Sequence, residues 1–166
     1  MDKVCYRPIG VIRSAFKDQG STPIQSAFSQ SPGTVELFPE YAPGLKDLAG
    51  FSHIFLIYHF HRAAKGALIE RPFIDRGSER GIFAIRHFNR PNPIGLSVVE
   101  LKAVRGNVLE LGPVDILDGT PLLDIKPYIS KFDRPDNPRC GWFDEKGIGS
   151  VKAESFTPDA LNRRQP

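Results

Sequence analysis

Fifteen glycines and fifteen prolines are spread along this chain and divide it into short apolar runs that are rich in β-branched and aromatic residues. Short strands separated by turn residues favour an antiparallel sandwich or barrel. No strand-like run alternates with a long helix, which disfavours a doubly wound parallel sheet. The runs that we predict as strands are Tyr6–Ser14, Thr34–Phe38, Phe51–His61, Gly81–His87, Leu96–Val104, Val108–Leu111 and Val114–Leu117.

Turn and helix signals are local. The residues from Arg105 to Asn107 separate two of the apolar runs and predict a hairpin turn. Helical signals are confined to single turns at Pro43–Leu48 and Arg62–Leu68 and to a terminal segment at Pro158–Asn162. The sequence therefore predicts a mainly β fold with a few short helices.

The composition is that of an ordinary single domain. A length of 166 residues can bury a substantial core, and the apolar (40%) and charged (25%) fractions are typical of a soluble globular protein. No apolar run approaches the roughly 20 residues that a membrane span requires. The N-terminal residues lack the pattern of a signal peptide, and Cys5 and Cys140 lie too far apart in sequence to suggest a disulfide framework. These observations predict a cytoplasmic protein that does not act at a membrane.

Basic residues are concentrated in one part of the chain. Between Arg62 and Arg90 there are seven lysines and arginines against three acidic residues, although the net charge of the whole chain is only +3. Such a patch can attract nucleic acid or a phosphate-bearing ligand. An ordinary solvated face explains the same excess equally well.

The segment Arg86–Ser97 holds the densest cluster of functional groups. It places two arginines, a histidine and two asparagines around Pro91 and Pro93. Because proline fixes φ and lacks a backbone N–H, we predict a stiff loop here, neither helix nor central strand. Guanidinium and amide groups on a stiff loop suit an anionic or zwitterionic ligand, and a solvated turn is the alternative. If Gly81–His87 is a strand, Arg86 lies at the mouth of its apolar face.

A second segment carries a weaker signal. Asp118 and Gly119 follow an apolar run and predict a tight turn that brings backbone groups close to a ligand. Asp124, Lys126 and Tyr128 alternate, so they share one face if this stretch is a strand. The carboxylates are candidates for acid–base groups or for partners of an ammonium, and a solvated turn with a surface carboxylate is again the alternative.

No metal site is predicted. The histidines are His53, His59, His61 and His87, and among them His59 and His61 have the i, i+2 spacing that places two side chains on one strand face. Zinc sites ordinarily combine closely spaced ligand pairs, and the isolated cysteines do not supply one. A hydrogen-bonded histidine pair at the end of a strand is therefore the preferred interpretation.

Five segments together resemble one known family, and they occur in the order that the family shows. They are Tyr6–Ser14, Ser21–Gln25, Leu48–His61, Arg86–Ser97 and Val114–Tyr128. On these motifs the chain resembles the TsaA/TrmO-like family of S-adenosylmethionine-dependent tRNA N6-methyltransferases. The resemblance covers roughly residues 4–133, and the ordered combination is far more specific than any single motif.

The resemblance implies an antiparallel β-barrel, a homodimer, and methylation of N6-threonylcarbamoyl-adenosine next to the tRNA anticodon. It implies a barrel domain over residues 1–135 and a C-terminal extension over residues 136–166 that packs on this domain or extends from it as an arm. It also implies that S-adenosylmethionine is bound by Pro23, Ile24, Gln25, His61, Arg62, Arg86, Leu96, Leu117, Asp118, Gly119 and Thr120.

The chemistry of three of these residues suits the cofactor. Its amino-acid part is zwitterionic, its sulfonium is positive and its adenine has apolar faces. We expect Arg86 to pair with the carboxylate, Asp118 to bind the ammonium or a ribose hydroxyl, and Leu96 to pack on the adenine. No metal is needed for transfer of the methyl group, because alignment supplies much of the acceleration.

The acceptor needs different groups. Its N6 is urea-like and poorly nucleophilic, so removal of its proton must be assisted. Our candidates for this catalytic role are Asp124, Lys126 and Tyr128. Arg90 is our candidate for the threonyl carboxylate, because a guanidinium binds a carboxylate through two hydrogen bonds.

Two other functions remain open at this point. A noncatalytic RNA-binding barrel would use the basic segment with Phe88 and Tyr128 to hold unpaired bases, and it would not bind S-adenosylmethionine. A metal-dependent hydrolase would use His59, His61 and Asp118, and a chelator would inhibit it.

Overall fold

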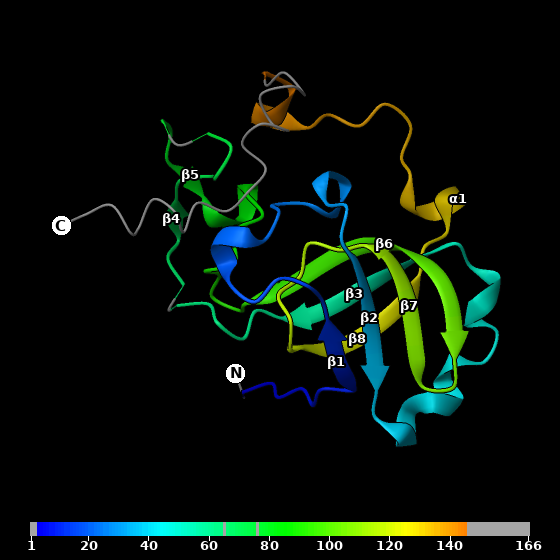
Figure 1. Cartoon of the computed structure of the whole chain (residues 1–166). Helices are drawn as coiled ribbons and strands as arrows, with labels where there is room; N and C mark the ends of the chain where they lie inside the picture. Colours follow the sequence, from blue (N-terminus) through cyan, green and yellow to red (C-terminus); the bar gives the residue numbers. More distant parts are fainter. Residues whose placement is uncertain (1–2, 65, 76, 146–166) are drawn as a thin grey trace.

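The structure, a computed structural model, describes residues 3–64, 66–75 and 77–145. Six antiparallel strands close into a barrel in the order β1-β2-β7-β6-β3-β8 (Figure 1). The predicted mainly β, antiparallel barrel is therefore confirmed. The barrel strands are β1 (Gly10–Arg13), β2 (Pro32–Leu37), β3 (His53–His59), β6 (Ile94–Arg105), β7 (Val108–Pro113) and β8 (Thr120–Pro127).

A small lobe stands beside the barrel, at the end where β3 finishes and β6 begins (Figure 1). It contains the two-stranded sheet of β4 (Ile69–Glu70) and β5 (Arg80–Gly81). The helices are all short: η1 (Gln19–Ser21), η2 (Ser26–Phe28), η3 (Pro39–Leu45), η4 (Leu48–Gly50), η5 (Ile82–Ala84), α1 (Ser130–Asp133) and η6 (Gly141–Glu145). No helix in the described part of the chain is long and apolar enough to span a membrane.

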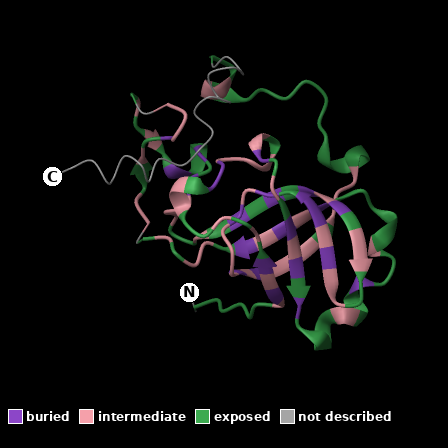
Figure 2. Cartoon of the chain, in the orientation of Figure 1, coloured by how far each residue is buried: buried purple, intermediate pink, exposed green. Residues whose placement is uncertain are grey.

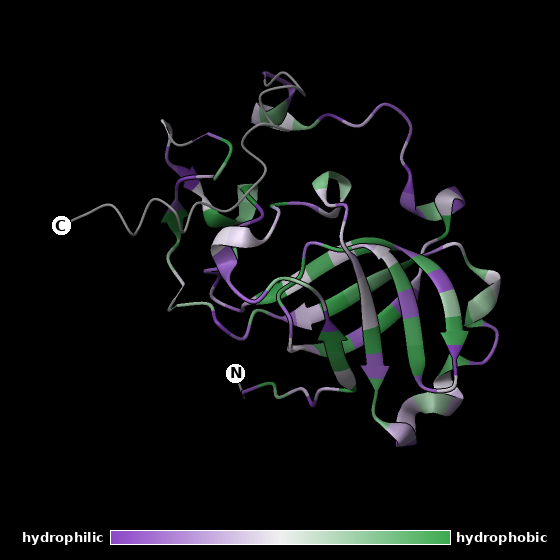
Figure 3. Ribbon diagram, viewed as in Figure 1, coloured by the Kyte–Doolittle hydropathy of each residue, from purple (hydrophilic) through white to green (hydrophobic). Residues whose placement is uncertain are grey.

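The core fills the inside of the barrel because the strands alternate inward and outward residues. In β3 the buried side chains are Ile54, Leu56 and Tyr58, and their neighbours are half-buried or exposed. Figure 2 shows this alternation as bands of buried and less buried residues along the barrel strands, and Figure 3 shows the apolar residues there. The buried residues of β3 are apolar except for the hydroxyl of Tyr58, which is buried inside the barrel near the lobe.

Two predicted strands are wrong. The segment Gly81–His87 leaves β5 after Gly81 and turns into η5, so Ile82 and Ile85 are both buried while Phe83 is exposed. The turn is stable because Arg90 Nη1 donates to the carbonyls of Ile82 (3.1 Å) and Ile85 (2.7 Å). The segment Val114–Leu117 is irregular, and the next strand is β8, which begins at Thr120.

The turn and helix predictions fare unevenly. The hairpin turn at Arg105–Asn107 is confirmed, since Arg105 pairs with Val108 and Gly106 takes a positive φ of 62°. The turn predicted at Pro43–Leu48 overlaps η3, which begins four residues earlier and ends at Leu45. The helix predicted at Arg62–Leu68 is wrong: the described residues of this segment form a turn at Arg62 and no helix, and the Asn89 side chain accepts the N–H of Ala64. The segment Pro158–Asn162 lies outside the described residues.

The chain leaves the barrel after β8 and crosses to the lobe. Residues 131–140 are exposed along this crossing, and η6 then packs on the lobe through Trp142, whose Nε1 donates to the carbonyl of Ala84 (2.9 Å). The free cysteines Cys5 and Cys140 are both exposed. The boundary predicted at residue 135 stays a prediction, and residues 146–166 of the predicted extension lie outside the described part.

Candidate functional site

The barrel wall opens where β6 extends beyond β7. β6 begins at Ile94, but its pairing with β7 starts only at Leu101. The first half of β6 therefore pairs with β3 along one edge and meets η2 along the other. Ser26, the first residue of η2, fixes this contact through its Oγ, which donates a hydrogen bond to the carbonyl of Val98 (3.3 Å).

A cavity of about 490 Å³ lies along this edge of β6. Its walls come from the loop before η2, the end of β3, the segment around η5 and the chain between β7 and β8, which are far apart in sequence and side by side in the fold (Figure 1). The predicted cofactor residues that line it are Pro23, Ile24, Gln25, His61, Arg62, Arg86, Leu96, Leu117 and Thr120.

Arg86 is held in place at the cavity wall. Its Nη1 donates to Gln25 Oε1 (2.7 Å), and the Gln25 amide in turn donates to the carbonyl of Ile24 (2.7 Å). These two hydrogen bonds orient the guanidinium of Arg86, which is otherwise exposed. The guanidinium is therefore available to an anion in the cavity. The strand that was expected to present Arg86 does not form, yet the side chain still reaches the cavity.

His61 closes another side of the cavity. Its Nδ1 lies 3.4 Å from Thr120 Oγ1. Burial, and then the neighbouring Arg62 and His59, lower the pKa of His61. The ring is therefore neutral at physiological pH and adds no charge to the cavity.

Asp118 and Gly119 lie outside the cavity wall, although both were predicted to contact the cofactor. The Asp118 carboxylate accepts hydrogen bonds from the Ser14 N–H (3.1 Å) and from Lys17 Nζ (2.7 Å), which holds its pKa below the usual range. Gly119 has a positive φ of 76°, and its N–H donates to the Ile12 carbonyl. These bonds fasten the predicted tight turn to β1, and the turn presents Leu117 and Thr120 to the cavity.

The carboxylate that does face the cavity is Asp115, which the sequence did not single out. Asp115 Oδ1 accepts a hydrogen bond from Ser97 Oγ (2.9 Å), and Ser97 Oγ lies 3.0 Å from the Tyr58 hydroxyl. The backbone N–H of Ser26 also bonds to the Asp115 side chain. In the described part of the chain, Asp115 is the one acidic residue that lines this cavity. Its signals in the sequence were its position inside an apolar run and its place in the Val114–Tyr128 motif.

Burial sets the protonation state of this network. Burial raises the pKa of Asp115 to about 6, against the hydrogen bonds from Ser97 and the backbone and the charge of Arg86. Burial and the charge of Asp115 raise the pKa of Tyr58 above its usual range. Near neutral pH the cavity therefore combines one carboxylate, a neutral phenol and the Arg86 guanidinium.

Arg90 also lines the cavity, but its guanidinium is partly committed. Its Nη1 holds the η5 turn through two backbone carbonyls, and its Cζ lies 5.9 Å from the centre of the Phe83 ring. Only its remaining donors can reach a ligand. Its predicted role toward the threonyl carboxylate therefore depends on Nε and Nη2.

Asp124, Lys126 and Tyr128 do not line the cavity of their own chain. Asp124 and Lys126 project outward from β8, where they form an ion pair (2.9 Å). The Tyr128 ring packs against Phe55, with ring centres 5.6 Å apart. Their predicted catalytic role stays a prediction, and it requires the cavity of another molecule.

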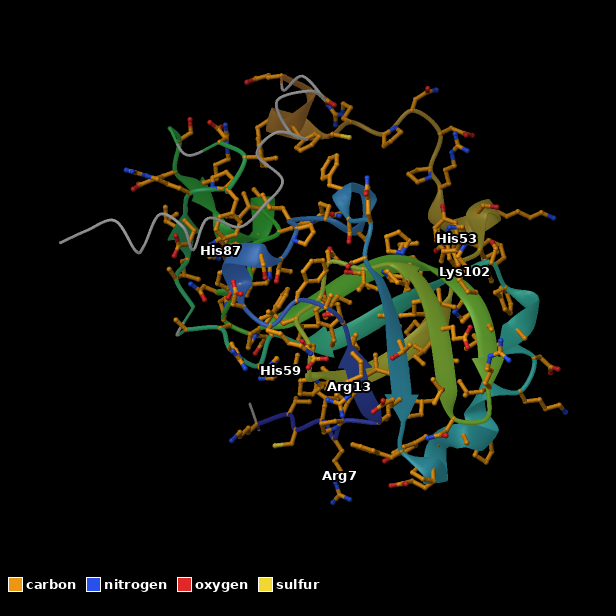
Figure 4. All side chains as sticks on the ribbon, in the orientation of Figure 1. Arg7, Arg13, His53, His59, His87 and Lys102 are labelled. Carbon is orange, nitrogen blue, oxygen red and sulfur yellow. The ribbon has the colours of Figure 1, made fainter. Side chains whose placement is uncertain are left out.

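The histidines do not form a metal site. His59 ends β3 and is exposed, and Figure 4 shows the labelled His53, His59 and His87 at separate places on the fold. Within the described ranges, no three histidine, cysteine or acidic side chains are grouped to hold a metal ion. Asp118, the third residue of the alternative metal site, is paired with Lys17.

Comparison with known proteins agrees with this architecture. Residues 11–134 match the family of the tRNA-methyltransferase O N-terminal domain. The chain is 54% identical over 150 residues to a probable S-adenosyl-L-methionine-binding protein of Pyrococcus abyssi. The aligned part covers 90% of this chain and 80% of that protein. It is 37% identical over 139 residues to the tRNA (adenine(37)-N6)-methyltransferase of Escherichia coli, covering 78% of this chain and 59% of the relative.

Solved structures show the same fold. A crystal structure of TrmO superposes with a TM-score of 0.72 at 36% identity, covering 84% of this chain and 64% of that one. A crystal structure of TrmO from Pseudomonas aeruginosa gives a TM-score of 0.71, also at 36% identity, and covers 85% of this chain and 63% of that one. The chain thus spans less than two thirds of each of these two structures.

Proposed function

The chain belongs to the tRNA-methyltransferase O family, and from this premise we propose that it methylates N6 of N6-threonylcarbamoyl-adenosine beside the tRNA anticodon, using S-adenosylmethionine. Relatives named as binding S-adenosylmethionine and as methylating tRNA adenine support the two halves of this proposal. The protein then works in the cytoplasm, where mature tRNA is used.

The observation that carries the proposal is the pairing of charges in one cavity. Arg86 offers a fixed guanidinium, and Asp115 offers a carboxylate held by Ser97. A zwitterionic amino-acid group needs both signs within one site. We therefore assign the cofactor carboxylate to Arg86, and its ammonium to Asp115 in place of Asp118.

The remaining walls suit the rest of the cofactor. Leu96 is 60% exposed on β6 and lines the cavity, so its side chain can cover an apolar adenine face. His61 is neutral and does not repel a sulfonium. Bound S-adenosylmethionine supplies the methyl group as an electrophile. The part of this chain is to hold the donor and acceptor in line, because alignment can supply about 7 to 11 kcal/mol of the barrier.

We propose a homodimer that forms through the outer face of β3 and β6. This face carries an apolar stripe of Ile57 on β3 with Ile94, Leu96 and Val98 on β6. Exposed apolar stripes on a soluble protein are typical of interaction sites. A second copy of the chain carries the same stripe and can cover it in a twofold dimer.

The dimer also accounts for the acceptor-side residues. Asp124 pairs with Ile57 across the strands, so it borders the same outer face, and Lys126 and Tyr128 follow it. In a twofold dimer this face of one copy lies against the same face of the other, where Leu96 borders the cavity. We propose that Asp124, Lys126 and Tyr128 assist proton removal from N6 in the cavity of the partner.

Calorimetry with S-adenosylmethionine, run with and without a chelator, tests the proposed cofactor. We expect binding in the micromolar range or tighter, about −8 kcal/mol or better, and no effect of the chelator. A noncatalytic RNA-binding barrel would bind RNA and leave S-adenosylmethionine unbound. Loss of binding on chelation would support the metal-dependent alternative.

A further inference from the structure

A second cavity of about 540 Å³ adjoins the first on the side of the lobe. The two share seven wall residues: Ile24, Gln25, Phe73, Phe83, Ile85, Arg86 and His87. Aromatic rings dominate the second cavity, and three of them line it without lining the first: Phe28, Trp142 and Phe143. Of the two residues that we assign to the cofactor's charged groups, Arg86 lies in the common wall and Asp115 does not line the second cavity.

The aromatic walls are held in fixed positions. Trp142 is fastened through Nε1 to the Ala84 carbonyl, and the Arg80 guanidinium lies 4.6 Å from the centre of its ring. The rings of His87, Phe73 and Phe88 contact one another in one cluster, with His87 4.7 Å from Phe73 and 4.5 Å from Phe88 between ring centres, and the two phenylalanines 5.5 Å apart. Fixed flat walls favour a flat ligand, because little side-chain freedom is lost when it stacks.

His87 gives this cavity a directed hydrogen-bond donor. The ring is 6% exposed, and its Nδ1 accepts the N–H of Asn89 (3.1 Å), which leaves the ring proton on Nε2. Burial lowers the pKa of His87, so the ring is neutral at physiological pH. Nε2 has no hydrogen-bond partner within the described ranges and is not among the fully enclosed polar atoms, so it is open to a ligand.

Resting on the proposed function, we propose that this second cavity binds the acceptor base, an adenine unstacked from the RNA loop. A heteroaromatic ring combines flat faces for the aromatic walls with ring nitrogens that accept a hydrogen bond from His87 Nε2. The shared wall at Gln25 and Arg86 places such a base next to the cofactor cavity, as transfer between the two requires. Enzymes that modify a base commonly take it out of the stack into a separate pocket of this kind.

The charges around the cavity fit an RNA more closely than an apolar peptide. The segment from Arg62 to Arg90 carries an excess of four positive charges. Arg86 lies in the wall, and Arg90 lies beside Phe83. A polyanionic backbone is attracted to such a rim, and its unpaired base can then stack inside.

Trp142 provides a direct test, because it is the only tryptophan in the chain. The probe is an anticodon stem-loop RNA that carries N6-threonylcarbamoyl-adenosine, and the matched control is the same RNA with an abasic residue at that position. We expect the modified RNA to quench the Trp142 emission at saturation by at least a third, and the abasic RNA to leave it within a tenth of its starting value. Quenching by S-adenosylmethionine alone, with no response to RNA, would assign the cavity to the cofactor and overturn the proposal.

A pair of variants adds a functional readout. Phe143 lines only the second cavity, whereas Phe132 is 80% exposed and lines neither cavity. We expect Phe143→Ala to raise the KM for the modified RNA about tenfold or more, while the Kd for S-adenosylmethionine changes less than twofold. Phe132→Ala, on α1 away from the cavity, should alter neither.

The outcomes separate this inference from the proposed function. Methyl transfer that proceeds normally in Phe143→Ala, with no change in Trp142 emission on RNA binding, would overturn the acceptor-base cavity and leave the activity standing. Quenching by the modified RNA without methyl transfer would support the cavity and count against the activity. Equal quenching by the abasic RNA would show that Trp142 responds to the RNA backbone, against the proposal.

Discussion

At the scale of single residues, the site depends on which charges are buried and which are already paired. Asp118 is satisfied by Lys17 and Ser14, whereas Asp115 enters the cavity wall with Ser97 and Tyr58 behind it. Burial raises the pKa of a carboxyl group when hydrogen bonds and nearby charges offset the loss of hydration only in part. The charge of such a group then depends on its surroundings. Asp115, which lies in the Val114–Tyr128 motif but was given no role there, is thus the carboxylate of the cavity whose charge changes near neutral pH.

This placement predicts a pH dependence of stability. Asp115 keeps its proton up to about pH 6 in the folded protein, against 3.8 for an unperturbed aspartate. Between these values the folded chain binds more protons, so the contribution of Asp115 to the free energy of unfolding is present below pH 3.8 and is lost as the pH rises through 6. We expect a loss of up to about 3 kcal/mol, since each pKa unit corresponds to about 1.4 kcal/mol.

Urea denaturation of the protein and of Asp115→Asn between pH 4 and 8 measures this effect. The difference between the two stabilities should shift in favour of Asp115→Asn as the pH rises from 4 to 7. The lowered pKa values of His61 and His87 act with the opposite sign, but they are common to both proteins and cancel in the difference. A difference that does not change with pH would show that Asp115 is not buried as described.

Arg86 supplies the second residue-scale prediction. We expect Arg86→Ala to weaken S-adenosylmethionine binding by about 1 to 3 kcal/mol, because a charged hydrogen bond is lost. Calorimetry measures the change, and Arg13→Ala is the matched control, because Arg13 pairs with Glu36 on the barrel surface. Equal affinity in the folded Arg86→Ala variant would remove Arg86 from the cofactor site.

At the scale of elements, β6 is what opens the site. It is a strand of 12 residues beside a β7 of 6 residues, so half of its length forms a cavity edge. Gly95 lies in that half against the ring of Tyr58, where a Cβ atom would collide with the ring carbons. The strand therefore needs glycine here to seat Tyr58 in its contact with Ser97.

Gly95→Ala tests this arrangement. Overpacking of a filled core typically costs about 1 to 3 kcal/mol, and we expect a loss of that size in the free energy of unfolding. Gly44→Ala is the matched control, because a Cβ at Gly44 meets no atom within 4 Å. Equal stability of the two variants would mean that Tyr58 is not fixed against Gly95.

The elements also show how far a sequence can predict this fold. The strands β2, β3, β6 and β7 follow from alternating apolar residues, because that pattern is local. The segment after Gly81 misled us, because Ile82 and Ile85 are buried three residues apart in a turn that a later residue, Arg90, stabilises. Sequence order does not reveal such a bond.

The site was predictable to a similar degree. Nine of the eleven residues that the family motifs suggested for the cofactor line this cavity. Asp115 was missed because its partners, Ser97 and Ser26, come from other elements, and the cavity itself exists only once those elements are together. The carboxylate of Asp118 pairs with Lys17 outside the cavity wall, and a turn motif does not show to which side a carboxylate points.

At the scale of the whole molecule, the three residues that we propose for the acceptor side, Asp124, Lys126 and Tyr128, lie outside the cavity of their own chain. The outer face of β3 and β6 is apolar, and Asp124 lies at its border. We expect sedimentation to show a dimer at micromolar concentration. Ile57→Glu, which puts a charge into the stripe without touching the cavity wall, should yield monomers that keep their circular dichroism. A wild-type protein that sediments only as a monomer would contradict the proposed assembly.

The central claim is that this cavity supports methyl transfer to a modified tRNA adenine. The direct measurement is tritium transfer from labelled S-adenosylmethionine to tRNA purified with and without the threonylcarbamoyl group. We predict transfer to the modified tRNA and little to the unmodified one. A guanidinium that binds the threonyl carboxylate is left unpaired by an acceptor that lacks this group, and the site therefore discriminates against that acceptor. Arg90→Lys should lower this transfer more than it lowers cofactor affinity. Equal transfer to both tRNAs, or none to either while S-adenosylmethionine is bound, would contradict the account.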